Sequence, residues 1–191
     1  MTVNPRVALL VIALALAGCA HKGMPDYGKV PAFALTDQDG MPFTRETLAG
    51  QVWAAAFIFT RCPSACPRVT IAMQGVQLQA KMRNLPLHLV SFSVDPEYDT
   101  PDVLRRYGTE FRADFATWSF VTGDSAAIKK TAEQGLKIAV DGKADPSKPD
   151  FGITHGTQLV LVDSKGEIRG YYATNDEEAL TRLLDDAISL R

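Results

Sequence analysis

The chain has 191 residues, of which 46% are hydrophobic and 22% are charged, and its formal net charge is −2. This length favours a single domain, and this composition argues against global disorder. The weak negative charge, without a long basic run, argues against nucleic acid as a main partner. No glycine-rich window resembles a phosphate-binding loop.

The first 19 residues, MTVNPRVALLVIALALAGC, have the pattern of a bacterial export signal. Arg6 precedes an apolar run from Val7 to Ala17, which at about 11 residues is shorter than the roughly 20 of a membrane-spanning helix. The run ends in LAGC, which resembles a lipobox, so we predict cleavage before Cys19 and acylation of that residue. The alternative is a plain secretory signal with a chance cysteine. Lipidation predicts a protein of the bacterial cell envelope, held at a membrane by acyl chains and facing the periplasm or the extracytoplasmic side.

The first predicted elements of the domain are a hairpin, a buried strand and a helix. PAFALTDQDGMPFT contains two β-type runs around Asp39-Gly40, which predicts a hairpin. RETLAG predicts one helical turn. VWAAAFIFT, residues 52–60, is a continuous apolar run that is typical of a buried central strand. CPSACP follows at once, and apolar residues then recur near helical spacing from Pro67 to about Arg83.

The later elements alternate in the same way. LPLHLVSFSVD and WSFVTG predict two more buried strands, and DTPDVLRRYGTEF between them predicts a helix capped by Thr100 with Pro101 at its first position. DSAAIKKTAEQG predicts a helix capped by Asp124 or Ser125 and ended by Gly135. QLVLVD and GEIRGYYA predict a hairpin joined at SKG, and NDEEALTRLLDDAISL predicts a closing helix.

Strands that alternate with helices, followed by a late antiparallel hairpin, predict an α/β fold with a mixed central sheet flanked by helices. The predicted organisation is a signal at residues 1–19, a polar tether at 20–30 and one domain at 31–191. One stretch lacks periodicity: residues 141–156, DGKADPSKPDFGITHG, which are polar and rich in proline and glycine. Long loops in compact domains are often functional, and this one carries His155.

Two of the three cysteines, Cys62 and Cys66, lie between the predicted strand and helix. This order places them at the C-terminal end of a strand, where ligand sites gather in open α/β sheets. It also places Cys66 near a helix N-terminus, where unpaired N–H groups and the dipole favour a thiolate. A structural disulfide is one alternative, but a loop of about five residues would contribute only about 2 kcal/mol. A reversible disulfide and a metal site are better supported.

Two thiolates suit Cu(I), which is a soft ion, and an imidazole could complete a trigonal site. Of the three histidines, His21 lies in the tether, and His88 lies in an apolar strand and is predicted to be a satisfied core residue. His155, in the long loop just before a strand, is the candidate ligand. The alternative for His155 is a solvated loop side chain without a partner.

FIFTRCPSACP, SFSVDPEYDTP, WSFVTG and the histidine-containing loop before LVLVD together resemble the Sco/SenC family, over about residues 30–190. The resemblance implies a thioredoxin-like fold and a copper site of Cys62, Cys66 and His155 that binds Cu(I) or Cu(II). It also implies a metallochaperone that helps to build the copper A centre of cytochrome c oxidase. The implied partners are the oxidase subunit that carries this centre, or another copper acceptor, and a thiol reductase.

Some members of this family look more like thiol-disulfide reductases for the cysteines of that centre. Cys62 and Cys66 are therefore also a candidate redox-active pair, in which one thiolate attacks a disulfide and the other resolves the mixed species. This oxidoreductase is the alternative to the metallochaperone, and the sequence leaves both open. A thiol peroxidase, for which Thr60 and Arg61 would be the relevant neighbours, does not suit the paired-cysteine layout.

Three further residues bear on the resemblance. Asp95 and Asp99 match the acids of the family's VDPxxDTP segment, and we interpret them as a corner between a strand and a helix. Thr154 stands where many members have an acidic residue before the histidine. The immediate surroundings of the histidine are therefore expected to differ, although the ligands themselves are present.

Overall fold

The computed structural model describes residues 23–142, 144–145 and 147–191. Seven strands form one sheet in the order β2-β1-β5-β4-β3-β8-β9. The centre of this sheet is parallel and consists of β3 (Val52–Ile58), β4 (Leu87–Ser93) and β5 (Trp118–Thr122). The predicted α/β fold with a mixed central sheet is confirmed.

Antiparallel hairpins extend the sheet on both sides. β1 (Ala34–Asp37) and β2 (Pro42–Thr44) are joined through Gly40, whose φ of +76° lies in the left-handed region that glycine adopts without strain. The 3₁₀ helix η1 (Arg45–Leu48) follows β2. β8 (Leu159–Val162) and β9 (Ile168–Tyr172) form the second hairpin, in which β8 also pairs antiparallel with β3. Both predicted hairpins are confirmed.

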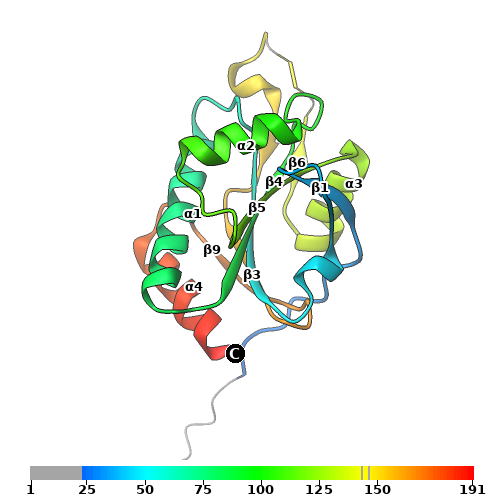
Figure 1. The fold of residues 1–191 in the computed structure, drawn as a ribbon. Coiled ribbons are helices and arrows are strands. Elements are labelled where there is room, and N and C mark those ends of the chain that lie inside the picture. Colours follow the sequence, from blue (N-terminus) through cyan, green and yellow to red (C-terminus); the bar gives the residue numbers. More distant parts are fainter. Residues whose placement is uncertain (1–22, 143, 146) are drawn as a thin grey trace, which may run out of the picture.

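Helices cover both faces of the sheet (Figure 1). α1 (Ala65–Met82), α2 (Pro101–Glu110) and α4 (Glu177–Ser189) pack on one face, and α3 (Ser125–Lys130) with the π-helix η2 (Thr131–Leu136) packs on the other. Strand β3 is buried along its whole length because apolar clusters pack against both of its faces. Burial on both faces explains why its sequence is apolar without alternation.

Two helix starts follow the signals in the sequence, whereas one helix end does not. The side chains of Thr100 and Asp124 accept hydrogen bonds from backbone N–H groups at the starts of α2 and α3. The helix after Asp124 does not end at Gly135, as predicted, but continues as η2 to Leu136. Gly135 and Leu136 are both buried, and tertiary packing overrides the weak helix propensity of glycine. The left-handed Lys137, with a φ of +58°, ends the helix.

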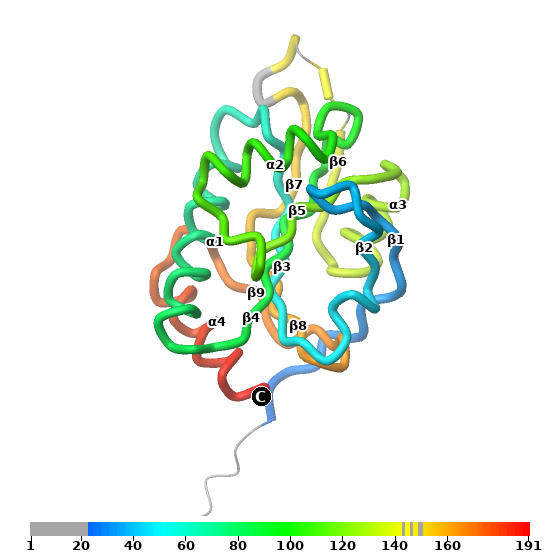
Figure 2. The backbone as a smooth tube through the Cα atoms, in the orientation of Figure 1, coloured from blue at the N-terminus to red at the C-terminus, as the bar shows by residue number. Residues whose placement is uncertain are grey.

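The stretch that lacks periodicity in the sequence contains secondary structure. β6 (Val140–Asp141) pairs antiparallel with β7 (Thr154–His155), and the 3₁₀ helix η3 (Pro149–Gly152) precedes β7. This ribbon and the start of α1 lie at the same end of the central sheet, at the top of Figure 1 and of the tube in Figure 2. His155 therefore lies on a short strand rather than in an irregular loop, which corrects the sequence prediction.

The segment from Tyr27 to Val30, which falls in the predicted tether, lies along β9. The backbone N–H of Tyr27 donates to Ile168 O over 3.0 Å, and that of Val30 donates to Gly166 O over 2.9 Å. The side chain of Val30 is fully buried. This part of the tether is therefore packed against the domain. No helix in the part of the chain that the structure describes is long and apolar enough to cross a membrane.

Candidate functional site

Cys62 lies in the turn between β3 and α1, and Cys66 lies at the start of α1, both at the C-terminal end of the parallel strands. Cys66 is in the first turn of α1 and is fully buried, whereas Cys62 is 6% exposed. The sulfur of Cys62 accepts a hydrogen bond from the backbone N–H of Cys66 over 3.4 Å. This sulfur thus satisfies one of the N–H groups that a helix start leaves unpaired. Both residues are free thiols in the structure, so their disulfide stays a prediction.

The environments of the two sulfurs differ. Burial raises the pKa of Cys62, but hydrogen bonds from the N–H groups of Cys66, Ser64 and Ala65 outweigh burial, and the net pKa is below the ordinary thiol value. Burial raises the pKa of Cys66 well above that value, and the Phe59 N–H, 3.4 Å from its sulfur, offsets only part of the effect. Cys62 is therefore the more readily ionised of the two thiols. The prediction that the helix start would favour a thiolate at Cys66 is wrong, because burial of the Cys66 sulfur in the core beneath α1 disfavours its charged form.

Strand β7 brings His155 to the thiols. Its Nε2 lies 3.3 Å from Cys66 Sγ, and its Nδ1 lies 3.0 Å from the carbonyl oxygen of Gly156. Burial lowers the pKa of His155, although the Gly156 carbonyl opposes this, so the ring is neutral at neutral pH. When Nδ1–H donates to Gly156, Nε2 keeps its lone pair on the side of the thiols, which is the arrangement of a metal-binding histidine.

Asp95 and Asp99 form the corner between β4 and α2, as predicted, and they also bind the segment before the cysteines. Asp99 is fully buried and accepts hydrogen bonds from Thr60 N over 3.1 Å, from the Thr60 hydroxyl, and from Ser93 Oγ over 2.6 Å. Asp95 accepts one from Arg61 Nε over 2.8 Å. Sequence reasoning missed these contacts. The available signal was the position of both acids directly after β4, because β4 and β3 are parallel neighbours and end at the same edge.

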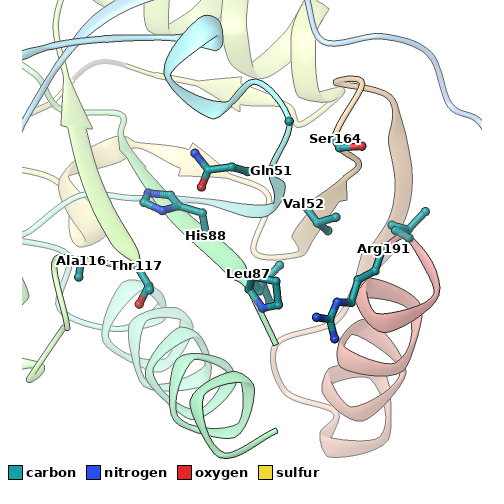
Figure 3. Close-up of a pocket in the computed structure, with 11 residues that line it drawn as sticks. Gln51, Val52, Leu87, His88, Ala116, Thr117, Ser164 and Arg191 are labelled. Carbon is teal, nitrogen blue, oxygen red and sulfur yellow. The ribbon is translucent and has the colours of Figure 1, made fainter. Parts of the chain in front are cut away.

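His88 lies away from these groups, at the opposite end of the sheet. It is half-buried, and its Nε2 lies 3.0 Å from Ser119 Oγ, so its polar edge is satisfied as predicted. It lines a pocket with Gln51 and Thr117 at the N-terminal ends of the parallel strands (Figure 3). Ligand sites of open α/β sheets form at the other end, so this pocket is not part of the thiol site.

Three other residues that the sequence analysis singles out are not among the groups described at the site. Thr154 is exposed and pairs with Asp141 in the β6–β7 ribbon. Cys19 and His21 lie outside the residues that the structure describes. The lipidation of Cys19 therefore stays a prediction.

Two thiols, of which Cys62 is the more readily ionised, and one imidazole thus gather at one end of the sheet. Sulfur and imidazole donors suit soft ions such as Cu(I). Among the described residues, no group of three or more His, Cys, Asp or Glu side chains is already placed to hold a metal ion. The part of the site that is already formed is the contact between Cys66 and His155. The Cys62 sulfur is held nearby by the hydrogen bond that it accepts from the Cys66 N–H. The donor types fit a soft ion, and the third ligand still has to move into place.

Solved structures of other proteins resemble this one over most of its length. A SCO1/SenC family lipoprotein from Bacillus anthracis str. Ames is 32% identical with a TM-score of 0.78, over 85% of this chain and 94% of that chain. BsSco, described as a member of the Sco family of cytochrome c oxidase assembly proteins with a disulfide switch, is 30% identical with a TM-score of 0.77, over 87% and 95%. ScoI of Bradyrhizobium japonicum, solved with copper bound, is 26% identical with a TM-score of 0.69, over 82% and 98%.

These likenesses confirm the thioredoxin-like fold expected from the motifs around the cysteines. The SCO1/SenC family model matches residues 23–187, which is most of the chain and includes both cysteines, the corner acids and His155. The resemblance carried by CPSACP and VDPEYDTP is therefore confirmed, and the chain belongs to the SCO1/SenC family.

Proposed function

We propose that the protein is a copper-binding metallochaperone that helps to assemble the copper A centre of cytochrome c oxidase or supplies another copper acceptor. The proposed ligands are Cys62, Cys66 and His155. The observation that carries the proposal is the 3.3 Å contact between Cys66 Sγ and His155 Nε2, at the end of the sheet where ligands bind. A related protein, 26% identical, has been solved with copper bound, which supports copper as the ion.

The three donors have different properties, which suits both uptake and release of copper. Cys62 is the more readily ionised thiol and the less buried one, whereas Cys66 has to lose a proton when the ion binds. His155 lies on a two-residue strand at the rim of the site, not in the central sheet. Transfer then proceeds by ligand exchange, in which thiolates of the acceptor replace these donors one at a time.

Alanine in place of His155 is expected to weaken Cu(II) binding by more than about tenfold and Cu(I) binding by less than about threefold, because two thiolates dominate the soft ion. The reduced protein is titrated with each ion in competition with a chelator. His88→Ala is the matched control, because His88 lies at the opposite end of the sheet. Equal loss of both ions would contradict this division of roles, and a wild-type protein that binds no copper would refute the function.

The difference between the two thiols favours a second function, that of a thiol-disulfide oxidoreductase. The Cys62 thiolate attacks a disulfide of the partner, and one partner sulfur leaves as a thiolate. Cys66, after losing its proton, displaces the other partner sulfur. The products are a Cys62–Cys66 disulfide and a partner reduced by two electrons, and a thiol reductase restores the dithiol. The disulfide switch in the description of BsSco supports this alternative.

In the metal-free reduced protein, iodoacetamide is expected to modify Cys62 before Cys66. The rate at Cys62 should rise with pH through a midpoint below that of an unperturbed thiol, because backbone N–H groups stabilise its thiolate. Cys66 should react only slowly until the protein unfolds, because its sulfur is fully buried. Mass spectrometry of timed samples measures both rates. Faster modification of Cys66 would reverse the roles assigned to the attacking and resolving thiols.

We further infer that the protein acts outside the cytoplasm and is anchored to a membrane through acylated Cys19. The LAGC motif at the end of residues 1–19 supports this, and one solved relative is described as a lipoprotein. In this proposal residues 20–30 connect the anchor to the domain at 31–191. The thiols would then lie in an oxidising compartment, which is why a reducing partner is part of the proposal.

A further inference from the structure

Arg61, the residue before Cys62, is packed between two aromatic rings from distant parts of the chain. Its guanidinium carbon lies 4.4 Å from the centroid of the Tyr98 ring and 4.7 Å from that of Phe151. Its Nε donates to Asp95 over 2.8 Å, and the Asp95 side chain is 2% exposed. The planar guanidinium covers two rings while its edge binds a buried carboxylate. The ammonium group of lysine is not planar and cannot make both contacts in this way.

The two rings are anchored differently. Tyr98 belongs to the corner between β4 and α2, where its backbone N–H donates to Asp95 O over 3.0 Å. Phe151 lies in η3, and its φ of +55° is a left-handed conformation that costs energy for a residue with a side chain. Two contacts of its ring compensate for this cost. The ring packs against the Arg61 guanidinium, and it forms a T-shaped contact with the Phe59 ring, with 6.2 Å between the two centroids.

Phe151 is connected to His155 by packing as well as by the chain. The ring of Phe59 contacts both of them, with centroids 6.2 Å from Phe151 and 6.0 Å from His155. Ile153, between them in sequence, is 6% exposed and belongs to the core. A displacement of Phe151 from the face of Arg61 would therefore move the imidazole relative to Cys66.

We propose that Arg61 is a positioning residue. Its guanidinium holds Phe151 against the corner between β4 and α2 that contains Tyr98, and so keeps the His155 imidazole next to the thiols. Arg61 is not itself a ligand, because a guanidinium has no acceptor atom. The copper readouts of this inference rest on the proposed function, whereas its metal-free readouts do not. If Arg61 only neutralised Asp95, its replacement would lower stability without changing the environment of His155.

Matched substitutions separate these two roles. Arg61→Met removes the cation but leaves the Asp95 carboxylate unpaired, whereas Phe151→Leu keeps the Arg61–Asp95 pair and removes only the clamped ring. Arg61→Lys keeps the charge without the planar group. Arg105→Met is the control, because Arg105 also covers an aromatic ring, Phe115 at 4.9 Å, and pairs with an aspartate on another part of the surface.

The metal-free full chain gives the first test. Arg61→Met and Phe151→Leu are both expected to speed amide hydrogen exchange in residues 151–156 by at least about tenfold. Both should also shift the ring signals of His155 in NMR spectra. Arg61→Lys should be intermediate, and Arg105→Met should match the wild type. Unchanged exchange and unchanged ring signals in Phe151→Leu would overturn the proposal, whether or not the protein binds copper.

The copper-loaded protein gives the second test. Arg61→Met and Phe151→Leu are expected to speed the loss of Cu(II) to a chelator by about tenfold and to leave Cu(I) affinity within about twofold. In a His155→Ala background, Arg61→Met should have no further effect on Cu(II), because its influence passes through the imidazole. An undiminished effect in that background would overturn the proposal. A wild-type chain that binds no copper would refute the metallochaperone alone, and the metal-free exchange would still decide the role of Arg61.

Discussion

Serine in place of Cys66 is expected to lower the affinity for both copper ions by more than about 100-fold with little change in the fold. The sulfur at this position meets the His155 imidazole and accepts the N–H of Phe59. A serine hydroxyl has a similar shape and can accept the same N–H, so the core beneath α1 stays packed. It is a hard donor that does not ionise near neutral pH, so Cu(I) would lose one of its two thiolates.

Competition titration with a chelator measures this loss, and the thiolate-to-copper absorption band of the Cu(II) form reports it independently. Cys19→Ser is the matched control, because it makes the same change at the third cysteine, outside the described residues. The control is expected to keep the band, whereas Cys66→Ser and Cys62→Ser are expected to lose it. A Cys66→Ser protein that keeps the band and binds copper within about threefold of the control would remove Cys66 from the ligand set.

The features that the sequence predicts well are those determined by near neighbours in the chain. The side chains of Thr100 and Asp124 each accept from an N–H three residues ahead, which is a local signal. The Asp39-Gly40 pair specifies a turn for the same reason. The end of the sheet at which the site lies is predictable too. A strand followed by a short turn and a helix places CPSACP at the C-terminal end of the parallel strands, where ligands bind.

The features that the sequence does not predict depend on contacts between distant residues. The helix start suggests that Cys66 is the more readily ionised thiol, but burial in the surrounding core raises its pKa, and the pKa of Cys62 is the one that is lowered. A two-residue strand such as β7 is too short to show alternation, so the sequence predicts an irregular loop around His155. Arg61 and Asp95 are 34 positions apart, and no spacing rule pairs them.

Alanine in place of Asp99 is expected to lower the free energy of unfolding by about 2–4 kcal/mol at neutral pH. The buried carboxylate accepts hydrogen bonds from the Thr60 backbone and from the hydroxyls of Thr60 and Ser93, and alanine leaves all three donors without this acceptor. Asp99→Asn keeps one acceptor oxygen and should cost about 1 kcal/mol. Urea denaturation measures both losses, and Asp102→Ala, at an exposed acid of α2, is the control. A loss in Asp99→Ala no larger than in Asp102→Ala would contradict the proposed importance of this corner.

Asp99 should also give the stability of the protein a defined pH dependence. Burial raises the pKa of its carboxyl, and the hydrogen bonds from Ser93 and Thr60 offset only part of that rise. The pKa in the folded state is above the unfolded value of about 3.9, so the folded protein binds the proton of Asp99 more tightly than the unfolded chain does. The stabilisation that this proton provides is lost as the pH rises through the folded-state pKa.

Asp99→Asn has no ionisable group at this position. The stability of the wild type relative to Asp99→Asn is therefore expected to be greatest below about pH 4 and to shrink as the pH rises. Urea denaturation at several pH values measures this difference, and growth of the difference with pH would mean that the hydrogen bonds to the carboxylate outweigh its burial.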